Sequence, residues 1–363
     1  MYKVDSPQAE EFIHHEEILE TLEYARSHKD NRAFIEQLIE KAALCKGLTH
    51  REAATLLECD QPDLIERIFH LAKEIKQKFY GNRIVMFAPL YLSNYCVNGC
   101  VYCPYHAKNK TIARKKLTQE EIRKEVIALQ DMGHKRLAIE AGEDPVHNPI
   151  EYILECIKTI YSVHHKNGDI RRVNVNIAAT TVENYRKLKD AGIGTYILFQ
   201  ETYNKKSYLE LHPTGPKHDY DYHTEAMDRA MEGGIDDVGL GVLFGLEGYQ
   251  YEFAGLLMHA EHLEAVHGVG PHTISVPRIK HADDIDPNVF DNSLSDELFA
   301  KIIACIRIAV PYTGMIISTR ESETIRGKVL DYGISQISGA SRTSVGGYTE
   351  KERPHDSEQF DVS

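Results

Sequence analysis

The stretch IVMFAPLYLSNYCVNGCVYC, residues 84–103, joins an apolar run directly to three closely spaced cysteines. The run over 84–91 has the length and the nearly unbroken apolar character of a strand that is buried on both faces. Such strands belong to parallel sheets, in which the segments after the carboxyl ends of the strands carry the functional residues. The stretch therefore predicts a parallel α/β fold, with the cysteines at the rim that follows its first strand.

Seven more apolar runs follow, and amphipathic stretches of helical period separate them. The runs are RLAIEAG (136–142), RVNVNIA (172–178), GTYILFQ (194–200), DDVGLGVLF (236–244), HTISVP (272–277), GMIIST (314–319) and GISQIS (333–338). The helical candidates are Thr118–Met132, Pro149–Val163, Val182–Ala191, Asp221–Glu232, Tyr249–His267, Ser295–Ala309 and Glu321–Tyr332. Eight strand–helix alternations predict a TIM-like (βα)8 barrel. An open doubly wound sheet is the alternative, but eight strands of similar length favour closure.

The chain divides into three predicted parts. Residues 1–80 form a helical extension, in which Thr49 and Glu52 make a capping-box pattern. Residues 81–340 form the barrel. Residues 341–363 are rich in glycine and charge and lack a helical period, so the helix expected to cover the eighth strand is missing and the tail reads as truncated.

Composition excludes several classes of function. A net charge of -13 argues against nucleic acid as the main partner, because phosphate binding needs a basic face. No apolar stretch approaches the roughly 18 residues that span a bilayer, and the acidic N-terminus lacks the apolar core of a secretory signal. We therefore expect a cytoplasmic protein that does not enter the membrane. An odd count of seven cysteines, three of them in one loop, indicates metal ligation rather than disulfides.

The spacing Cys96-x3-Cys100-x2-Cys103 predicts a 4Fe–4S cluster. Three thiolates can hold three irons of a cubane and leave the fourth iron open for the amino and carboxylate groups of S-adenosylmethionine (SAM). One electron from the cluster then breaks the S–C5′ bond of SAM and yields a 5′-deoxyadenosyl radical. Tyr102 is placed to lie beside the adenine. The alternative is zinc, for which Cys103-x2-His106 supplies a possible fourth ligand.

Polar residues at the other strand ends complete a predicted radical SAM site. Glu143 and its neighbours after the second strand can take the SAM ammonium, and Gln200 with Glu201 after the fourth suits the ribose hydroxyls. Arg320 after the seventh strand is a natural carboxylate clamp, which Ser341 beyond the eighth can assist. The predicted catalytic set comprises Arg320, Ser341 and His272, the last from the sixth strand segment.

Several segments together show a resemblance to a known family. They include APLYLSNYCVNGCVYCPYHAKN (88–109), HKRLAIEAGEDP (134–145), HPTGPKHDYDYH (212–223) and VGPHTISVPR (269–278). The chain resembles the HydG family of FeFe-hydrogenase maturases, which are radical SAM tyrosine lyases. The resemblance implies hydrogen abstraction from the amino group of L-tyrosine and cleavage of its Cα–Cβ bond to p-cresol and dehydroglycine. It also implies a low-potential electron donor such as ferredoxin or flavodoxin, and other hydrogenase maturation proteins as partners.

The sequence departs from that family at its end. HydG proteins carry a second three-cysteine motif for an auxiliary cluster, where dehydroglycine becomes carbon monoxide and cyanide, but no cysteine follows Cys305 here. We therefore expect one cluster, with SAM and tyrosine cleavage but no auxiliary chemistry. A thiazole-forming tyrosine lyase is the nearest alternative function. A zinc-stabilised binding scaffold without catalysis is the alternative from another class.

Overall fold

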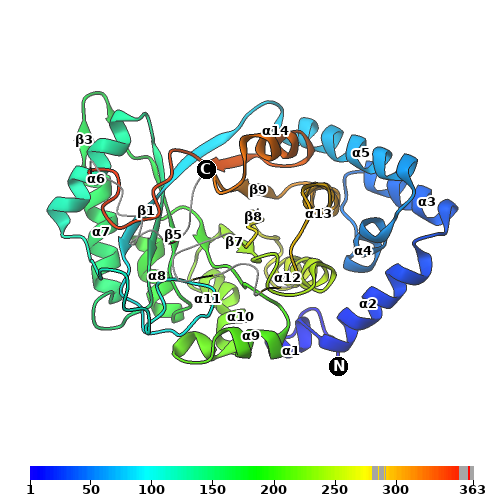
Figure 1. Ribbon diagram of the computed structural model, residues 1–363, viewed down its shortest axis with the longest axis horizontal. Helices are drawn as coiled ribbons and strands as arrows, with labels where there is room; N and C mark the ends of the chain where they lie inside the picture. The colour runs from blue at the N-terminus through cyan, green and yellow to red at the C-terminus, as the bar shows by residue number, and fades with distance from the viewer. Residues whose placement is uncertain (280–284, 286–289, 291, 351–358, 360–363) are drawn as a thin grey trace.

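The computed structural model describes residues 1–279, 285, 290, 292–350 and 359. Within them, eight parallel strands close into a barrel in the order β1-β10-β9-β8-β7-β6-β5-β2 (Figure 1). The strands are β1 (Val85–Ser93), β2 (Arg136–Ala141), β5 (Arg172–Asn176), β6 (Tyr196–Ile197), β7 (Val238–Gly241), β8 (Thr273–Ser275), β9 (Gly314–Ile317) and β10 (Gln336–Ser338). The closure confirms the predicted TIM-like barrel.

Helices cover the outside of the barrel. They are α6 (Gln119–Asp131), α7 (Ile150–Ser162), α8 (Val182–Asp190), α10 (Tyr220–Thr224), α11 (Ala226–Glu232), α12 (Tyr249–His267), α13 (Asp296–Ala309) and α14 (Glu323–Tyr332). The capping box predicted for α6 is formed, because Thr118 Oγ1 accepts from the Glu121 backbone N–H at 3.2 Å while Glu121 Oε2 accepts from the Thr118 N–H at 2.7 Å. Six of the seven predicted helices are present as single elements, with ends within two residues of the prediction.

One predicted helix, over 221–232, is wrong as a single element. The chain forms α10 and α11 instead, and they meet at Glu225, whose carboxylate accepts a hydrogen bond from the Ala9 backbone N–H at 2.9 Å. Three short elements had no counterpart in the prediction: the hairpin β3 (His164–His165) with β4 (Gly168–Asp169), helix α9 (Lys205–Leu211) and the 3₁₀ turn η1 (Pro216–His218). The last two lie between β6 and α10, where they shape the rim of the barrel.

The N-terminal helices lie on the flank of the barrel. They are α1 (Ala9–Phe12), α2 (His15–His28), α3 (Arg32–Ala43), α4 (His50–Glu58) and α5 (Pro62–Tyr80). Helices α2, α4 and α5 pack against the outer helices α12, α13 and α14, as Figure 1 shows on the side away from β1. The Thr49–Glu52 capping box of α4 is formed as predicted. Residues 1–80 therefore extend the helical layer sideways rather than closing either end of the barrel.

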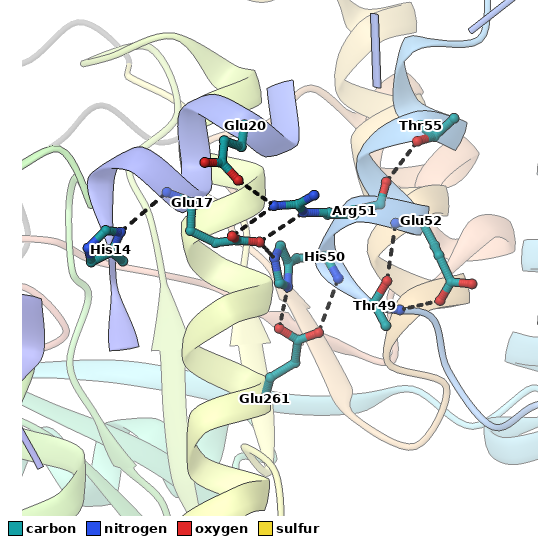
Figure 2. A network of polar contacts seen from close by, with 9 residues as sticks. All are labelled: His14, Glu17, Glu20, Thr49, His50, Arg51, Glu52, Thr55 and Glu261. Atoms are coloured by element: carbon teal, nitrogen blue, oxygen red, sulfur yellow. Dashed lines mark hydrogen bonds and ion pairs between the residues drawn. The ribbon is translucent and has the colours of Figure 1, made fainter. Parts of the chain in front are cut away.

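A buried ion cluster joins this extension to the barrel (Figure 2). His50 of α4 lies between two carboxylates, with Nε2 2.8 Å from Glu17 Oε1 of α2 and Nδ1 2.6 Å from Glu261 Oε2 of α12. Arg51 donates to both carboxylate oxygens of Glu17, at 2.9 and 2.8 Å. Burial alone would lower the pKa of His50, but the hydrogen bonds and charges of Glu261 and Glu17 outweigh it and raise that pKa. The imidazolium form therefore holds the three helices together.

The segment after β10 runs back over β1 and α6. Within the described residues 339–350 it forms no helix, in line with the predicted irregular tail, of which 351–358 and 360–363 lie outside the described residues. Tyr348 donates its hydroxyl to the Pro89 carbonyl at 2.6 Å, and the Tyr348 and Thr349 N–H groups donate to Glu125. None of the helices in the described residues has the length and apolar character needed to cross a membrane.

Candidate functional site

A cavity of about 240 Å³ opens at the carboxyl ends of the barrel strands. Eight of the ten residues predicted for the site line it: Cys96, Cys100, Cys103, Tyr102, Glu143, Glu201, Arg320 and Ser341. They come from the loops after β1, β2, β6, β9 and β10, so the barrel topology alone brings together segments that are far apart in sequence. The three cysteines and the predicted carboxylate clamp, Arg320, therefore line the same cavity.

The cysteine loop is held in shape by hydrogen bonds to its backbone. Arg114 donates to the carbonyls of Asn94, Tyr105, His106 and Asn109, at 2.5–3.2 Å. One guanidinium thus joins both ends of the loop, so Arg114, a basic residue that follows the cysteines, has a structural role. The loop is therefore shaped by its own polar contacts rather than by the cysteines alone.

Gly142 allows the end of β2 to lie directly against this loop. A side chain at this position would place its Cβ 2.2 Å from the Tyr95 carbonyl oxygen and 2.9 Å from Cys96 Cβ. The Val97 N–H donates to the Glu143 carbonyl at 2.8 Å, and Asn98 Nδ2 donates to Glu143 Oε2 at 2.6 Å. Close backbone approach of this kind requires glycine. The carboxylate of Glu143 is therefore fixed beside Cys96, and burial raises its pKa.

Burial changes the acidity of two thiols in the cysteine loop. Burial raises the pKa of Cys100 to about 11 and that of Cys103 to about 12, so both would stay protonated at neutral pH unless a positive charge compensates their thiolates. Within the described residues, no three histidine, cysteine, aspartate or glutamate side chains converge on one point as a single metal ion requires. A cubane binds each cysteine through a different iron and suits three thiols spread around one cavity.

Hydrogen bonds fix the Tyr102 side chain in the wall of the cavity. It is 4% exposed, its hydroxyl lies 2.7 Å from His212 Nε2, and Lys217 Nζ donates to that hydroxyl at 3.1 Å. Lys217 Nζ also lies 3.1 Å from Glu201 Oε1. Burial raises the pKa of Tyr102, so the phenol stays neutral. The predicted pair Tyr102 and Glu201 is therefore linked through a lysine that the sequence analysis did not select.

Glu201 and Gln200 point in different directions. Glu201 has a positive φ of 67°, a conformation that non-glycine residues seldom adopt, and its carboxylate lines the cavity. The next two residues are tied to Glu252 of α12, because Thr202 Oγ1 donates to Glu252 at 2.7 Å and the Tyr203 N–H also donates to it. Gln200 is 3% exposed, does not line the cavity, and donates to Thr224 at 2.8 Å. The prediction that Gln200 contacts the cofactor is therefore corrected: its side-chain amide binds Thr224 and does not line the cavity.

Arg320 lines the same cavity as the cysteines and interacts with an unexpected carboxyl group, that of Glu140. Burial raises the pKa of Glu140, at the end of β2, to about 7, although the charge of Arg320 opposes that shift. Burial lowers the pKa of Arg320 itself. Ser341 is 8% exposed, and its Oγ is buried without a hydrogen-bond partner in the described part of the chain. The lining of the cavity thus includes a cation, a carboxyl group with a pKa near neutrality and a hydroxyl without a partner in the described residues.

His272 is not brought to this cavity. It directly precedes β8 and therefore lies at the amino end of the strand, with Nδ1 3.4 Å from Asp237 Oδ1 just before β7. Burial lowers its pKa, and its side chain is 45% exposed. Because the cysteines follow the carboxyl end of β1, the two sites are at opposite ends of the barrel. The prediction of His272 as a catalytic residue placed it at the wrong end.

Glu140, Lys217 and His223 also line the cavity, although they were not predicted as site residues. Glu140 stood inside the quoted strand end EAGEDP, and its position two residues before Gly142 was an available signal. Lys217 and His223 follow β6 by about twenty residues, in the segment HPTGPKHDYDYH. A loop of that length after a barrel strand is itself a sign of function.

Comparison with known proteins agrees with this geometry. The Radical SAM superfamily model matches residues 90–259, and the Biotin and Thiamin Synthesis associated domain model matches 275–360. The chain is 58% identical to a HydG maturase of the [FeFe]-hydrogenase in a crystal structure, with a TM-score of 0.93, over 97% of this chain and 76% of that one. For HydG from Carboxydothermus hydrogenoformans the identity is 42% and the TM-score 0.87, over 97% and 80%. The 2-iminoacetate synthase of Salmonella typhimurium is 28% identical over 88% of this chain and 84% of that protein.

Proposed function

The chain belongs to the HydG family of radical SAM enzymes, and we propose that it cleaves the Cα–Cβ bond of L-tyrosine to p-cresol and dehydroglycine. One observation carries the proposal: a single cavity is lined by three thiols, an arginine and a serine whose buried hydroxyl is unsatisfied in the described part of the chain. That lining suits a cavity that holds a cofactor and an amino acid together. Dehydroglycine is another name for 2-iminoacetate, the product after which the Salmonella relative is named.

We assign the cluster ligands to Cys96, Cys100 and Cys103. A 4Fe–4S cluster held by these thiolates would supply the electron for reductive cleavage of SAM, the chemistry that would start hydrogen abstraction from the amino group of tyrosine. The chain's own residues bind and orient the reactants. The Tyr102 ring would flank the adenine, the Glu201 carboxylate would accept hydrogen bonds from the ribose hydroxyls, and the Glu143 carboxylate would face the SAM ammonium.

The other end of the cavity binds tyrosine. The Arg320 guanidinium presents parallel N–H donors that match a carboxylate, and Ser341 Oγ can add a further hydrogen bond. Glu140, whose pKa of about 7 makes it ionised in part at neutral pH, can accept a proton from the substrate ammonium through its carboxylate oxygens. A neutral amine is the form from which a hydrogen atom is removed. These residues therefore orient and deprotonate the amino acid for attack.

The lyase step belongs, in this proposal, to hydrogenase maturation. Dehydroglycine is the source of carbon monoxide and cyanide for the hydrogenase cluster, and the 58% identity to a hydrogenase maturase, against 28% to a 2-iminoacetate synthase, favours that route over thiazole formation. A low-potential ferredoxin or flavodoxin would supply the electron, and other maturation proteins would receive the product. We restrict the proposal to the lyase step, because the chain covers 76% and 80% of the two HydG chains.

Anaerobic reconstitution with iron and sulfide, followed by reaction with SAM and a reductant, tests the proposal. We expect a brown protein that forms 5′-deoxyadenosine and p-cresol together when tyrosine is present, with dehydroglycine recovered as glyoxylate after hydrolysis. Formation of 5′-deoxyadenosine without p-cresol would refute tyrosine as the substrate. A colourless protein that retains zinc would instead support the binding scaffold. Assays for carbon monoxide and cyanide then show whether this chain performs the lyase step alone or also the later conversion of dehydroglycine.

A further inference from the structure

The cysteine loop has an inner face and an outer face. On the inner face, Cys96, Asn98 and Cys100 line the cavity. Val97 and Val101, each of which directly follows a cysteine, are not part of that lining and are 38% and 44% exposed. Single exposed apolar side chains are common on protein surfaces, but these two lie four residues apart on one short loop. The outer face therefore places apolar surface one residue away from two of the assigned cluster ligands.

Backbone hydrogen bonds hold this outer face in place. The Val101 N–H donates to the Leu211 carbonyl at 3.0 Å, which fixes the loop to the end of α9. The Ala107 N–H donates to the Asn98 carbonyl at 2.8 Å. This second bond joins the loop to the segment that leads into Lys108. A surface that is already ordered loses little conformational entropy when a partner binds to it.

Five basic residues follow the cysteines, and three of them have partners of their own. The Arg114 guanidinium donates to backbone carbonyls of the cysteine loop. Lys115 Nζ lies 3.3 Å from a carboxylate oxygen of Glu350, and Lys116 Nζ lies 4.1 Å from the centre of the Tyr152 ring. The positive charges of these three residues therefore serve local contacts.

The other two basic residues, Lys108 and Lys110, are exposed and make no hydrogen bond or ion pair with any residue that the structure describes. No aspartate or glutamate occurs over residues 96–117, although the chain as a whole carries a net charge of -13. Both ammonium groups are therefore uncompensated within their own segment, which is bonded to the loop that exposes Val97 and Val101. Apolar groups beside free cations are complementary to a partner surface with an apolar centre and an acidic rim.

We propose that Val97, Val101, Lys108 and Lys110, the loop face, form the docking surface for an acidic protein that carries single electrons, an inference that rests on the proposed function. In the complex the carrier would be oxidised by one electron and the cluster reduced by one. Electron transfer between proteins slows steeply with distance, so the carrier must dock close to a cluster ligand. A small apolar contact with complementary charges around it suits a redox complex that forms and separates quickly.

Rapid mixing of the reconstituted protein with reduced flavodoxin, an acidic carrier, tests this inference. We expect the double variant Lys108→Gln, Lys110→Gln to lower the second-order rate constant of cluster reduction by about tenfold at low salt, because two steering charges are lost. The difference should shrink when salt screens the charges. Lys135→Gln is the matched control, since Lys135 is exposed and lies just before β2 at the other end of the barrel. Photoreduced deazaflavin, a small uncharged donor, should reduce all these proteins equally fast.

Direct binding separates docking from electron transfer. Isothermal titration calorimetry with oxidised flavodoxin measures the affinity without any turnover, and the double lysine variant should bind about tenfold more weakly at low salt. Val101→Asn should weaken binding by about fivefold at low and high salt alike, because the loss of an apolar contact is not screened. Val269→Asn is the matched control, since Val269 is 52% exposed and lies between α12 and β8 at the opposite end of the barrel.

The possible failures of the inference and of the proposed function are distinct. A wild-type rate and affinity in the double lysine variant would overturn the inference, and so would an equal loss of rate with deazaflavin, which would place the effect in the cluster itself. A wild-type protein that neither binds flavodoxin nor accepts its electron would overturn it as well. A protein that holds no 4Fe–4S cluster, or that cleaves SAM with deazaflavin but releases no p-cresol from tyrosine, would instead overturn the proposed function.

Discussion

Replacing His50 by glutamine removes the cation that joins the N-terminal helices to the barrel. Glutamine can still donate from its amide to one carboxylate, but it carries no charge and cannot reach both Glu17 and Glu261. The backbone N–H of residue 50 would keep its bond to Glu261 at 3.1 Å. The perturbation is therefore electrostatic and leaves the capping of α4 by Thr49 intact.

The expected cost follows from two charge-assisted hydrogen bonds of different burial. Each such bond contributes roughly 1.5–3 kcal/mol when shielded from water. The pair with Glu17 is well shielded, since the two side chains are 9% and 12% exposed, whereas Glu261 is 28% exposed and its bond is discounted for solvent screening. Arg51 continues to compensate Glu17 after the substitution. We expect His50→Gln to lower the free energy of unfolding by about 2–3 kcal/mol near pH 6.

The cost should depend on pH with a definite sign. The folded state raises the pKa of His50 above the unfolded value of about 6.5, so protonated His50 contributes stability that is complete below the unfolded pKa and is lost as pH rises through the folded pKa. Glutamine does not titrate. The difference in stability between the wild type and His50→Gln should therefore be largest at pH 6 and shrink as the solution becomes alkaline.

Urea unfolding between pH 6 and 9, together with hydrogen exchange of α2 and α4, measures this difference. His70→Gln is the matched control, because His70 makes an ion pair with Glu74 in which the side chains are 72% and 62% exposed, and its effect should be near zero. A loss below about 1 kcal/mol for His50→Gln, or a loss that does not change with pH, would refute the reasoning. Faster exchange should be confined first to α2 and α4.

Three other substitutions test the site and its support. Glu252→Gln removes a carboxyl whose pKa burial raises to about 8, so the wild type should lose stability relative to this variant as pH rises toward 8, by at most about 1.4 kcal/mol per pH unit in urea unfolding. Gly142→Ala should reduce bound iron per chain after reconstitution, because its Cβ would lie 2.2 Å from the Tyr95 carbonyl oxygen, while Gly327→Ala, with open space around its Cβ, should bind iron normally. Arg320→Lys should raise the KM for tyrosine by about tenfold or more without abolishing SAM cleavage, since lysine keeps the charge but lacks the paired donors; an unchanged KM would contradict the assignment.

The barrel could be predicted from the sequence because its signals are local. A buried parallel strand reads as a short apolar run, and a capping box such as Thr118 with Glu121 marks a helix start within four residues. The cysteine loop was equally accessible, since its three ligands lie within eight residues directly after the first run. Where the residues of one strand or one helix cap determine a structural element, that element can be predicted without knowing which distant residues it contacts.

The predictions at the site failed where the orientation of a side chain, or its contacts with residues distant in the sequence, determine its position. His272 opens an apolar run and so precedes its strand, which puts it at the end of the barrel opposite the cysteines. Gln200 and Glu201 are adjacent, but backbone geometry sends one side chain to Thr224 and the other into the cavity. The Lys217 ammonium contacts residues 16 and 115 positions before it in the chain. Contacts over such separations cannot be predicted from a short stretch of sequence.

Helix α12 is buried on nearly every side, because the barrel lies beneath it and the N-terminal helices cover it from outside. The same helix carries Glu252, which supports the loop of Glu201, and Glu261, which binds His50. A minimal catalyst made by cutting away residues 1–80 would thus expose an apolar ridge and leave Glu261 without its partner. Such a shortened enzyme would need the outer face of α12 redesigned with charged residues before it could be expected to stay in solution and keep its rim loop in order.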